Sequence, residues 1–180
     1  LENPKVVEVR AMVRDVSVVG EDVFPKDTRL KVVEGDVSDP DSIKAVLSGC
    51  THAVYTASGT GGASSIAVDD IGVTQTFKAC KEEGVQRMVL NSAQLVDPNK
   101  NGWNPLRMML NGVIAKGKPD CKFRSENGVR ELAGSGNTEY VIVRPGRLGD
   151  GEVGASGLLR VAQNNAGLSG QVHRGDVAAV

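Results

Sequence analysis

The stretch from Leu30 to Gly62 limits the possible folds of this chain more than any other part of it. It opens with the apolar, β-branched run Leu30–Val33, which predicts a buried strand. Aspartates that can cap a helix come next, and Gly49 ends that helix. The residues expected on its buried face are Ile43, Val46 and Leu47. A second strand, His52–Thr56, then runs into a glycine-rich turn, so the stretch predicts a βαβ unit with parallel strands.

The same alternation continues along the rest of the chain. Further strands are expected at Val6–Val13, Arg87–Leu90 and Tyr140–Val143, with a short extended piece at Gly170–His173. Helices are expected at 64–83, 105–115, 121–133 and 157–165, loops at 97–104 and 146–157, and a last helix capped by Asp176. This order predicts an α/β fold, a Rossmann-type doubly wound parallel sheet with helices on both faces. A length of 180 residues suits one domain, residues 1–180.

Charge and composition narrow the classes of partner. The 21 Lys and Arg residues nearly balance the 22 Asp and Glu residues, and aromatic residues make up only 3% of the chain. The sequence therefore lacks the basic stripe and the stacking surfaces typical of a nucleic-acid-binding protein. No apolar run approaches the ~20 residues that a membrane-spanning helix needs. We expect a small-molecule ligand rather than a nucleic acid or a membrane.

The cysteines and histidines argue against disulfides and metal. Cys50, Cys80 and Cys121 are odd in number and widely spaced, so free thiols in a reducing compartment are expected. A reactive thiol is the alternative, and Cys121 is the candidate because Lys122 beside it could lower its pKa. With only two, widely separated histidines, no metal site is predicted.

A glycine-rich phosphate loop is missing at the start of the sequence. A dinucleotide-binding fold opens with a strand, the pattern G-x-G-x-x-G and a helix. No such loop precedes Val6. The cluster Gly59-Thr60-Gly61-Gly62 comes later with another spacing, and a phosphate cradle there is an alternative. We expect the first strand and its glycine loop to lie upstream of Leu1, which leaves the sheet incomplete and exposes an apolar edge.

Six segments, in this order, resemble the atypical short-chain dehydrogenase/reductase superfamily, and within it the NAD(P)-binding, NmrA-like and isoflavone-reductase-like group. They are VRAMVRD, LKVVEGDVSDPDSI, AVYTASG, DDIGVTQTFKACKEEGVQRMVLNSAQ, KFRSENGVRELAGSGNTEYVIVRPGRL and GQVHRGDVAAV. The resemblance implies a nicotinamide dinucleotide bound along the carboxyl ends of the strands. Arg14, Asp36, Ser58 and Ser92 are expected to mark one continuous groove for it.

The resemblance assigns the adenine half of the cofactor to the first strand ends. Arg14, with Asp15 beside it, stands where NAD-specific proteins often carry a carboxylate, and a guanidinium favours the 2′-phosphate of NADP over NAD. Asp36 and Val37 match the family's adenine-binding pair, and a plain helix-entry turn is the alternative. The segment expected beside the ribose and pyrophosphate is Thr56, Ala57, Ser58 and Gly59, where small side chains are needed. A tight turn without ligand contacts is the alternative there.

The resemblance assigns the reacting end to Ser92 and Lys122. In active relatives this serine bonds the substrate carbonyl, and this lysine holds the nicotinamide ribose and lowers the pKa of a catalytic tyrosine. That tyrosine belongs at position 118, where this chain has Lys118. Tyr55 and Tyr140 both fall in expected strands, so neither replaces it. The turn that follows the last strand near the nicotinamide is Arg144, Pro145 and Gly146, and a purely structural turn is the alternative.

Two functions fit these residues. The first is an NADP-dependent oxidoreductase, with Ser92 and Lys122 as catalytic residues acting on a small carbonyl or activated C=C substrate. The second is a dinucleotide-sensing or scaffold protein with a protein partner, which the missing tyrosine favours. The resemblance places the protein in the cytoplasm or the plastid stroma, because relatives in photosynthetic organisms are often plastid-targeted.

Overall fold

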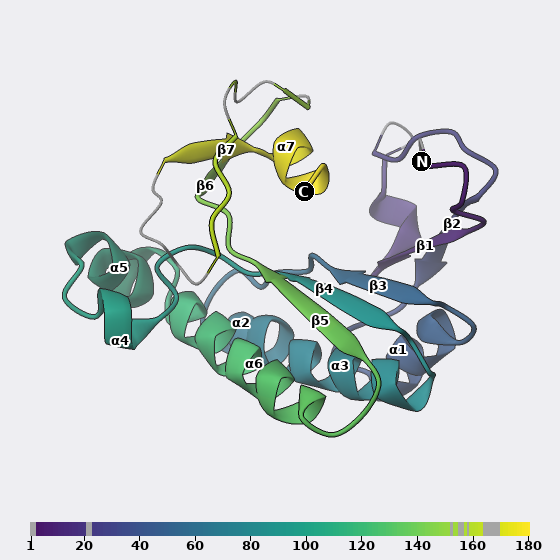
Figure 1. The fold of residues 1–180 in the computed structure, drawn as a ribbon, viewed down its shortest axis with the longest axis horizontal. Helices are drawn as coiled ribbons and strands as arrows, with labels where there is room; N and C mark the ends of the chain where they lie inside the picture. The colour runs from purple at the N-terminus through teal and green to yellow at the C-terminus, as the bar shows by residue number, and fades with distance from the viewer. Residues whose placement is uncertain (1–2, 21–22, 152, 155–156, 158, 164–169) are drawn as a thin grey trace.

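The computed structural model describes residues 3–20, 23–151, 153–154, 157, 159–163 and 170–180, and Figure 1 shows their arrangement. Its centre is a three-stranded parallel sheet in the order β3-β4-β5. These strands are β3 (His52–Tyr55), β4 (Arg87–Asn91) and β5 (Glu139–Val143). In the register of the sheet, Val54 pairs with Val89, and Val89 pairs with Val141. The predicted α/β fold with parallel strands is confirmed.

Two further pairs of parallel strands flank this sheet without joining it. One consists of β1 (Val9–Val13) and β2 (Leu30–Glu34), and the other of β6 (Arg147–Gly149) and β7 (Gln171–His173). The described strands therefore form three separate sheets rather than one. Among the described residues no strand lies between β1 and β3, so each of these two strands keeps one edge unpaired.

Helices pack on one face of β3-β4-β5. Figure 1 shows α1 (Pro40–Leu47), α3 (Val73–Glu82) and α6 (Lys118–Ala133) along that face. The core between them is fully buried, and its members include Phe77, Cys80, Val85, Met88 and Val129. On the other face Val54 is 68% exposed and Val141 is also exposed. The prediction of helices on both faces is therefore wrong for the described part of this sheet, where β6, β7 and α7 (Arg174–Ala178) lie beyond its end instead.

The predicted helix 64–83 forms as three consecutive pieces. They are α2 (Ala63–Ser65), the π-helix η2 (Ile66–Gly72) and α3. The apolar residue Ile66 is exposed, because Ser65 and Asp69 occupy the buried face. Polar side chains thus enter the core where this helix starts, and π-helical turns are often found near functional sites.

Other elements shift by a few residues. The helix α6 begins three residues earlier than predicted, at Lys118, because a proline in the first turn needs no hydrogen-bonded N–H. Its apolar residues Phe123 and Leu132 are only half-buried, whereas the polar residues Ser125 and Glu126 are buried. The region predicted to be helical at 105–115 forms α5 (Pro105–Met109) and the π-helix η3 (Leu110–Ile114).

Short elements occur inside predicted loops. The loop 97–104 contains α4 (Pro98–Asn101), the irregular region after β1 contains the 3₁₀ helix η1 (Val16–Val18), and the loop 146–157 contains β6. The predicted helix 157–165 lies partly outside the described residues, and residues 159–163 are not helical. Asp176 lies within α7 rather than capping it, and its carboxylate accepts the Gly154 N–H.

Candidate functional site

Arg14 and Asp36 lie close enough to interact at the ends of β1 and β2. The Asp36 carboxylate accepts the Ser38 N–H at 2.8 Å and the Ser38 hydroxyl at 2.7 Å. These bonds, and then the positive charge of Arg14, lower the pKa of Asp36. Arg14 itself is exposed. The first two strand ends therefore present one accessible guanidinium beside one ionised carboxylate.

The residues next to Arg14 and Asp36 have structural roles. Asp15 caps η1, and its bonds with the Ser17 hydroxyl and N–H lower its pKa. Val37 is buried in the core, so only its backbone can meet a ligand. Asp39, not Asp36, caps α1 by accepting the Asp41 N–H. Asp36 is thus not needed as the helix cap, although it does order the turn before α1.

A buried carboxylate, Asp69 of η2, gathers three of the predicted cofactor-binding residues at the end of β3. One oxygen accepts the Ser58 hydroxyl at 2.8 Å and lies 3.0 Å from the Lys122 Nζ. Its other oxygen accepts the Gly59 N–H at 2.9 Å. Asp69 is fully buried and the Lys122 side chain is 12% exposed. Thr56, Ala57 and Ser58 are exposed, whereas Gly59 is buried against the start of α2.

Tyr55, at the end of β3, is hydrogen-bonded to η2. Its hydroxyl donates to the Val68 carbonyl oxygen at 2.6 Å. Burial, and then the negative charges of Asp69 and Asp36, raise the pKa of Tyr55. A side chain at Gly72 would collide with this hydroxyl, so the contact needs glycine there. Tyr55 is therefore a structural residue.

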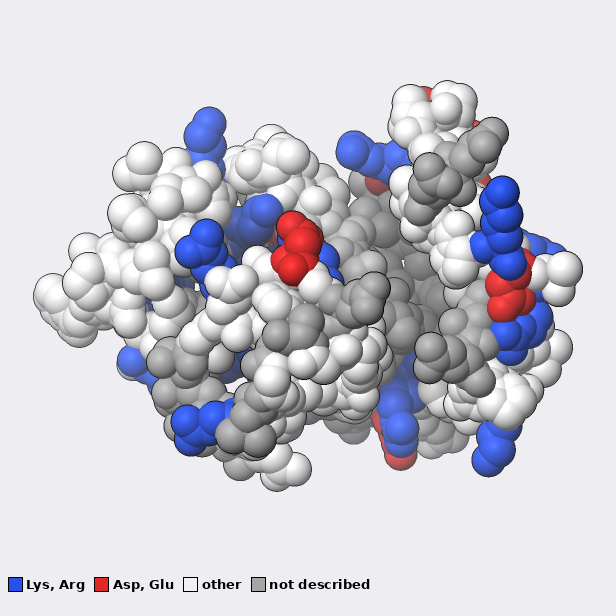
Figure 2. Space-filling model, turned by 90° about the horizontal axis from the view of Figure 1, so that it is seen from above, with Lys and Arg blue, Asp and Glu red and all other residues white. Residues whose placement is uncertain are grey.

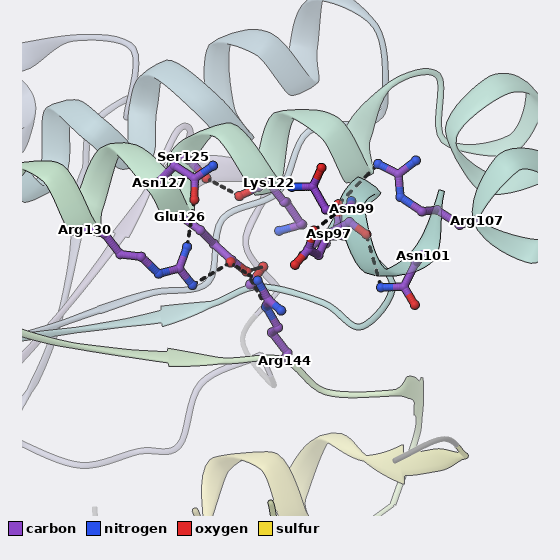
Figure 3. A network of polar contacts seen from close by, with 12 residues as sticks. Asp97, Asn99, Asn101, Arg107, Lys122, Ser125, Glu126, Asn127, Arg130 and Arg144 are labelled. Atoms are coloured by element: carbon purple, nitrogen blue, oxygen red, sulfur yellow. Dashed lines mark hydrogen bonds and ion pairs between the residues drawn. The ribbon is translucent and has the colours of Figure 1, made fainter. Parts of the chain in front are cut away.

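A second buried carboxylate, Glu126 of α6, joins the ends of β4 and β5, as Figure 3 shows. It accepts the Ser92 hydroxyl at 2.6 Å and the Arg144 Nε–H at 2.9 Å, and it forms a further ion pair with the other end of the Arg144 guanidinium. Arg130 reaches the same carboxylate at 3.1 Å. Burial alone would raise the pKa of Glu126, but its bonds with Arg144, Ser92 and Arg130 bring it below its usual value.

The turn at Pro145 and Gly146 runs beside Ser92. The Ser92 N–H donates to the Val143 carbonyl at 2.8 Å, and the Gln94 N–H donates to the Pro145 carbonyl at 2.9 Å. Pro145 is buried, and a side chain at Gly146 would collide with the carbonyl oxygen of Gly170. Packing alone explains these two residues, which agrees with the structural alternative for this turn.

The helix α6 unites the two clusters. Lys122 and Glu126 lie about one turn apart on it, so the Asp69 cluster and the Glu126 cluster are neighbours. The structure thus brings together Ser58, Gly59, Lys122, Ser92 and Arg144, whereas Arg14 and Asp36 lie together at the ends of β1 and β2. Neither Asp69 nor Glu126 was predicted from the sequence as a site residue. A carboxylate within an otherwise buried helical stripe is the signal that could have found both.

The remaining candidate residues, which are Lys118, Tyr140 and the cysteines, do not supply a catalytic group. Lys118, at the predicted tyrosine position, begins α6 and is half-buried, and Tyr140 packs edge-on against Phe77 in the core. All three cysteines are free, as predicted. Burial raises the pKa of Cys121, although Arg124 opposes the change, so the structure contradicts the idea of an activated thiol there.

The remaining surface features lie outside the Asp69 and Glu126 clusters. A hollow of about 600 Å³ lies at the opposite, amino end of the sheet, beside Arg87, Thr138 and Glu139. Figure 2 looks at the molecule from above: the basic side chains on the left of this view are scattered, and on the right several lie together around acidic atoms. The described residues contain no group of side chains suited to a metal ion, and none of their helices is long and apolar enough to cross a membrane.

Parallel strands whose carboxyl ends share a cluster of small and polar residues define a Rossmann-type nucleotide-binding protein. Comparison with known proteins agrees: residues 1–180 match the family model described as NAD(P)H-binding, and the chain belongs to that family. The resemblance to the atypical short-chain dehydrogenase/reductases is confirmed at this level.

The relatives are oxidoreductases or proteins without a described activity. An uncharacterized chloroplastic protein of Arabidopsis thaliana is 32% identical over 151 residues, which cover 78% of this chain and 50% of that protein. The chain thus spans about half the length of this curated relative. The oxidoreductase ylbE of Lactococcus lactis is 26% identical with a TM-score of 0.67, covering 95% of this chain and 70% of that one. ChuY, an anaerobillin reductase of Escherichia coli O157:H7, is 21% identical with a TM-score of 0.67, covering 96% and 75%.

Proposed function

We propose that the protein binds NADP(H) along the carboxyl ends of β1 to β5 and transfers hydride between this cofactor and a small carbonyl or activated C=C substrate. The observation that carries the proposal is the pair of buried carboxylates, Asp69 and Glu126, which hold side chains from three strand ends against one helix. An arrangement fixed in this way is preorganised for a ligand that spans several strand ends.

The adenine half of the cofactor is assigned to the ends of β1 and β2. Arg14 is exposed and free to pair with a 2′-phosphate, which is the reason to place NADP ahead of NAD. Asp36 is ionised and offers an acceptor for the adenine amino group, with the Val37 backbone beside it. The exposed residues Thr56 to Ser58 then pass the ribose and pyrophosphate.

The reacting half is assigned to Lys122 and Ser92. When bound, the nicotinamide supplies or accepts the hydride. Lys122 holds the adjoining ribose, and Ser92 contacts the substrate oxygen. Because Lys118 stands at the tyrosine position, the proton has to come from water or from another group.

A second function, a dinucleotide-binding protein without turnover, is favoured by one specific observation. The Ser92 hydroxyl has a single hydrogen, and it donates that hydrogen to Glu126. While this bond persists, Ser92 offers a substrate only its acceptor lone pairs and cannot polarise a carbonyl oxygen. In this case the ligand-bound site would report cofactor state to a protein partner. The chloroplastic relative favours the plastid stroma over the cytoplasm as its location for either function.

The test is a titration of the full-length protein with NADPH and NADH, followed by fluorescence, and then turnover on a panel of small carbonyl compounds. We expect NADPH to bind more tightly, and Arg14→Ala to weaken NADPH by about tenfold or more while leaving NADH unchanged, as loss of a charged hydrogen bond predicts. Binding of neither cofactor would refute the proposal.

Two variants then separate the two functions. Loss of turnover in both Ser92→Ala and Lys122→Ala supports the oxidoreductase. Ser125→Ala and Lys81→Ala are the matched controls, because Ser125 bonds a carbonyl of its own helix and Lys81 of α3 donates to the Leu132 carbonyl near the far end of α6. NADPH binding without turnover on any compound, unaffected by Ser92→Ala, supports the binding protein.

A further inference from the structure

We infer that Asp69 is a positioning residue of the cofactor site, which fixes the Lys122 ammonium and the Ser58–Gly59 turn relative to each other. This inference rests on the proposed function, because it concerns how that same site is held. Asp69 was not among the residues expected to contact the cofactor, and its two oxygens are occupied by groups of the chain itself.

The geometry shows why Asp69 has this role. Three donors from two distant segments converge on one fully buried carboxylate: the Ser58 hydroxyl, the Gly59 N–H and the Lys122 ammonium. A buried carboxylate is stable only when such donors surround it, so the fold keeps all three in place. Among the described residues, no other hydrogen bond or ion pair links the Ser58–Gly59 turn to α6, and Asp69 therefore sets the relative position of the two.

The same bonds decide what the site can offer a ligand. An ammonium carries three hydrogens, and Asp69 takes one, which leaves two for a ligand. The Ser58 hydroxyl hydrogen is also directed to Asp69, so Ser58 presents acceptor lone pairs. The Gly59 N–H already donates to Asp69, so it does not donate to a phosphate. Two donors beside one acceptor suit ribose hydroxyls, which both donate and accept, better than they suit a phosphate.

Asp70, the next residue of η2, provides a matched control. It forms an ion pair with Arg124 on α6, as Asp69 does with Lys122, but the Arg124 side chain is 53% exposed. No predicted cofactor-binding residue contacts it through a described hydrogen bond. Asp70→Asn thus removes the same charge from the same helix without touching the proposed site.

The experiment compares Asp69→Asn with Asp70→Asn in the full-length protein. The ligands are NADPH and adenosine 2′,5′-bisphosphate, which carries only the adenine half. Asparagine keeps an acceptor for Gly59 but removes the charge that holds Lys122. We expect Asp69→Asn to weaken NADPH by about tenfold to a hundredfold, as loss of a charged hydrogen bond predicts, and to leave adenosine 2′,5′-bisphosphate unchanged. Asp70→Asn should leave both affinities unchanged.

A double variant shows whether Asp69 acts through Lys122. The variant Asp69→Asn/Lys122→Met should bind NADPH no more weakly than Lys122→Met alone, because contacting residues are not additive. Should Asp69→Asn fail to fold while the double variant folds and binds like Lys122→Met, the rescue supports the same coupling.

Three results would overturn the inference while the proposed function stands. They are NADPH binding by Asp69→Asn as tight as in the wild type, an equal loss for NADPH and adenosine 2′,5′-bisphosphate, and a double variant that does not fold. Failure of the wild-type protein to bind NADPH or NADH would instead remove the proposed function, and the inference with it.

Discussion

Among single residues, Glu126 contributes most clearly to stability through its charge. Its carboxylate is fully buried and is shared by Ser92, Arg144 and Arg130. Replacement by glutamine leaves the Arg144 guanidinium without its partner in a site that is 18% exposed. Breaking a buried pair on one side costs about 3–5 kcal/mol, so we expect Glu126→Gln to lower the free energy of unfolding by about that amount at pH 7. Urea unfolding followed by circular dichroism measures it.

The pH dependence of this loss has a definite sign. The folded pKa of Glu126 lies below its ordinary value of 4.5, so its stabilisation is complete above pH 4.5 and is lost as the pH falls through the folded pKa. The difference between wild type and Glu126→Gln should therefore narrow in acid. Glu139→Gln is the control, because its ion pair with Arg87 is exposed and worth less than ~1 kcal/mol. A loss for Glu126→Gln that does not change between pH 7 and pH 4 would contradict this account.

At the scale of elements, the turn between β3 and α2 is held by close backbone packing. A methyl group at Gly59 would lie 2.5 Å from the Ser64 carbonyl oxygen, which is part of the helix that follows. The backbone cannot yield as a flexible side chain would. We expect Gly59→Ala to destabilise the protein by about 1–3 kcal/mol, the usual cost of overpacking, and to weaken NADPH binding because the turn moves.

The control for this change is Gly112→Ala. Gly112 lies in η3, where an added methyl group meets no atom within 4 Å, and alanine is favoured over glycine in helices by up to ~1 kcal/mol. Gly112→Ala should therefore be neutral or slightly stabilising. Equal urea midpoints for the two variants would show that the contact at Gly59 is not restrictive.

The same elements show how far the sequence predicts this fold. Apolar, β-branched runs located β2, β3, β4 and β5 to within a residue or two, because the residue types that favour a strand can be read from the local sequence. The sequence pattern did not predict the polar residues on the buried faces of η2 and α6. Asp69 and Glu126 are buried because donors from other segments surround them, and no pattern within one helix reports such partners.

The candidate site was predictable to a similar extent. The order of the motifs predicted where the strands end, and therefore where Asp36, Ser58 and Ser92 lie. It also predicted that Lys122 lies on the helix that is now α6. The direction of their hydrogen bonds was not predictable. Ser92 donates to Glu126, and Asp15 and Asp36 each accept from the serine two residues further along the chain. These bonds depend on side-chain positions that only the folded chain defines.

For the molecule as a whole, separate sheets predict unequal local stability. Neither β1 nor β2 contains a fully buried residue, whereas Met88 and Leu90 of β4 are buried in the core. Local opening requires less free energy where little apolar surface is buried. Amides of β1 and β2 should therefore exchange their hydrogens faster than those of β4, by at least about tenfold. Hydrogen exchange followed by mass spectrometry of peptides resolves these segments.

Addition of NADPH in the same experiment locates the ligand. Contacts at the carboxyl ends of the strands should slow exchange in peptides covering 13–16, 34–38 and 56–60, because bound ligand opposes local opening. Peptides covering 136–139, at the hollow on the amino side of the sheet, serve as the internal control and should not change. Slower exchange at 136–139 without change at the three strand ends would place the dinucleotide on the wrong edge for every role proposed above. Slower exchange at the strand ends would show that β1 and β2, neither of which contains a fully buried residue, gain stability from the bound cofactor.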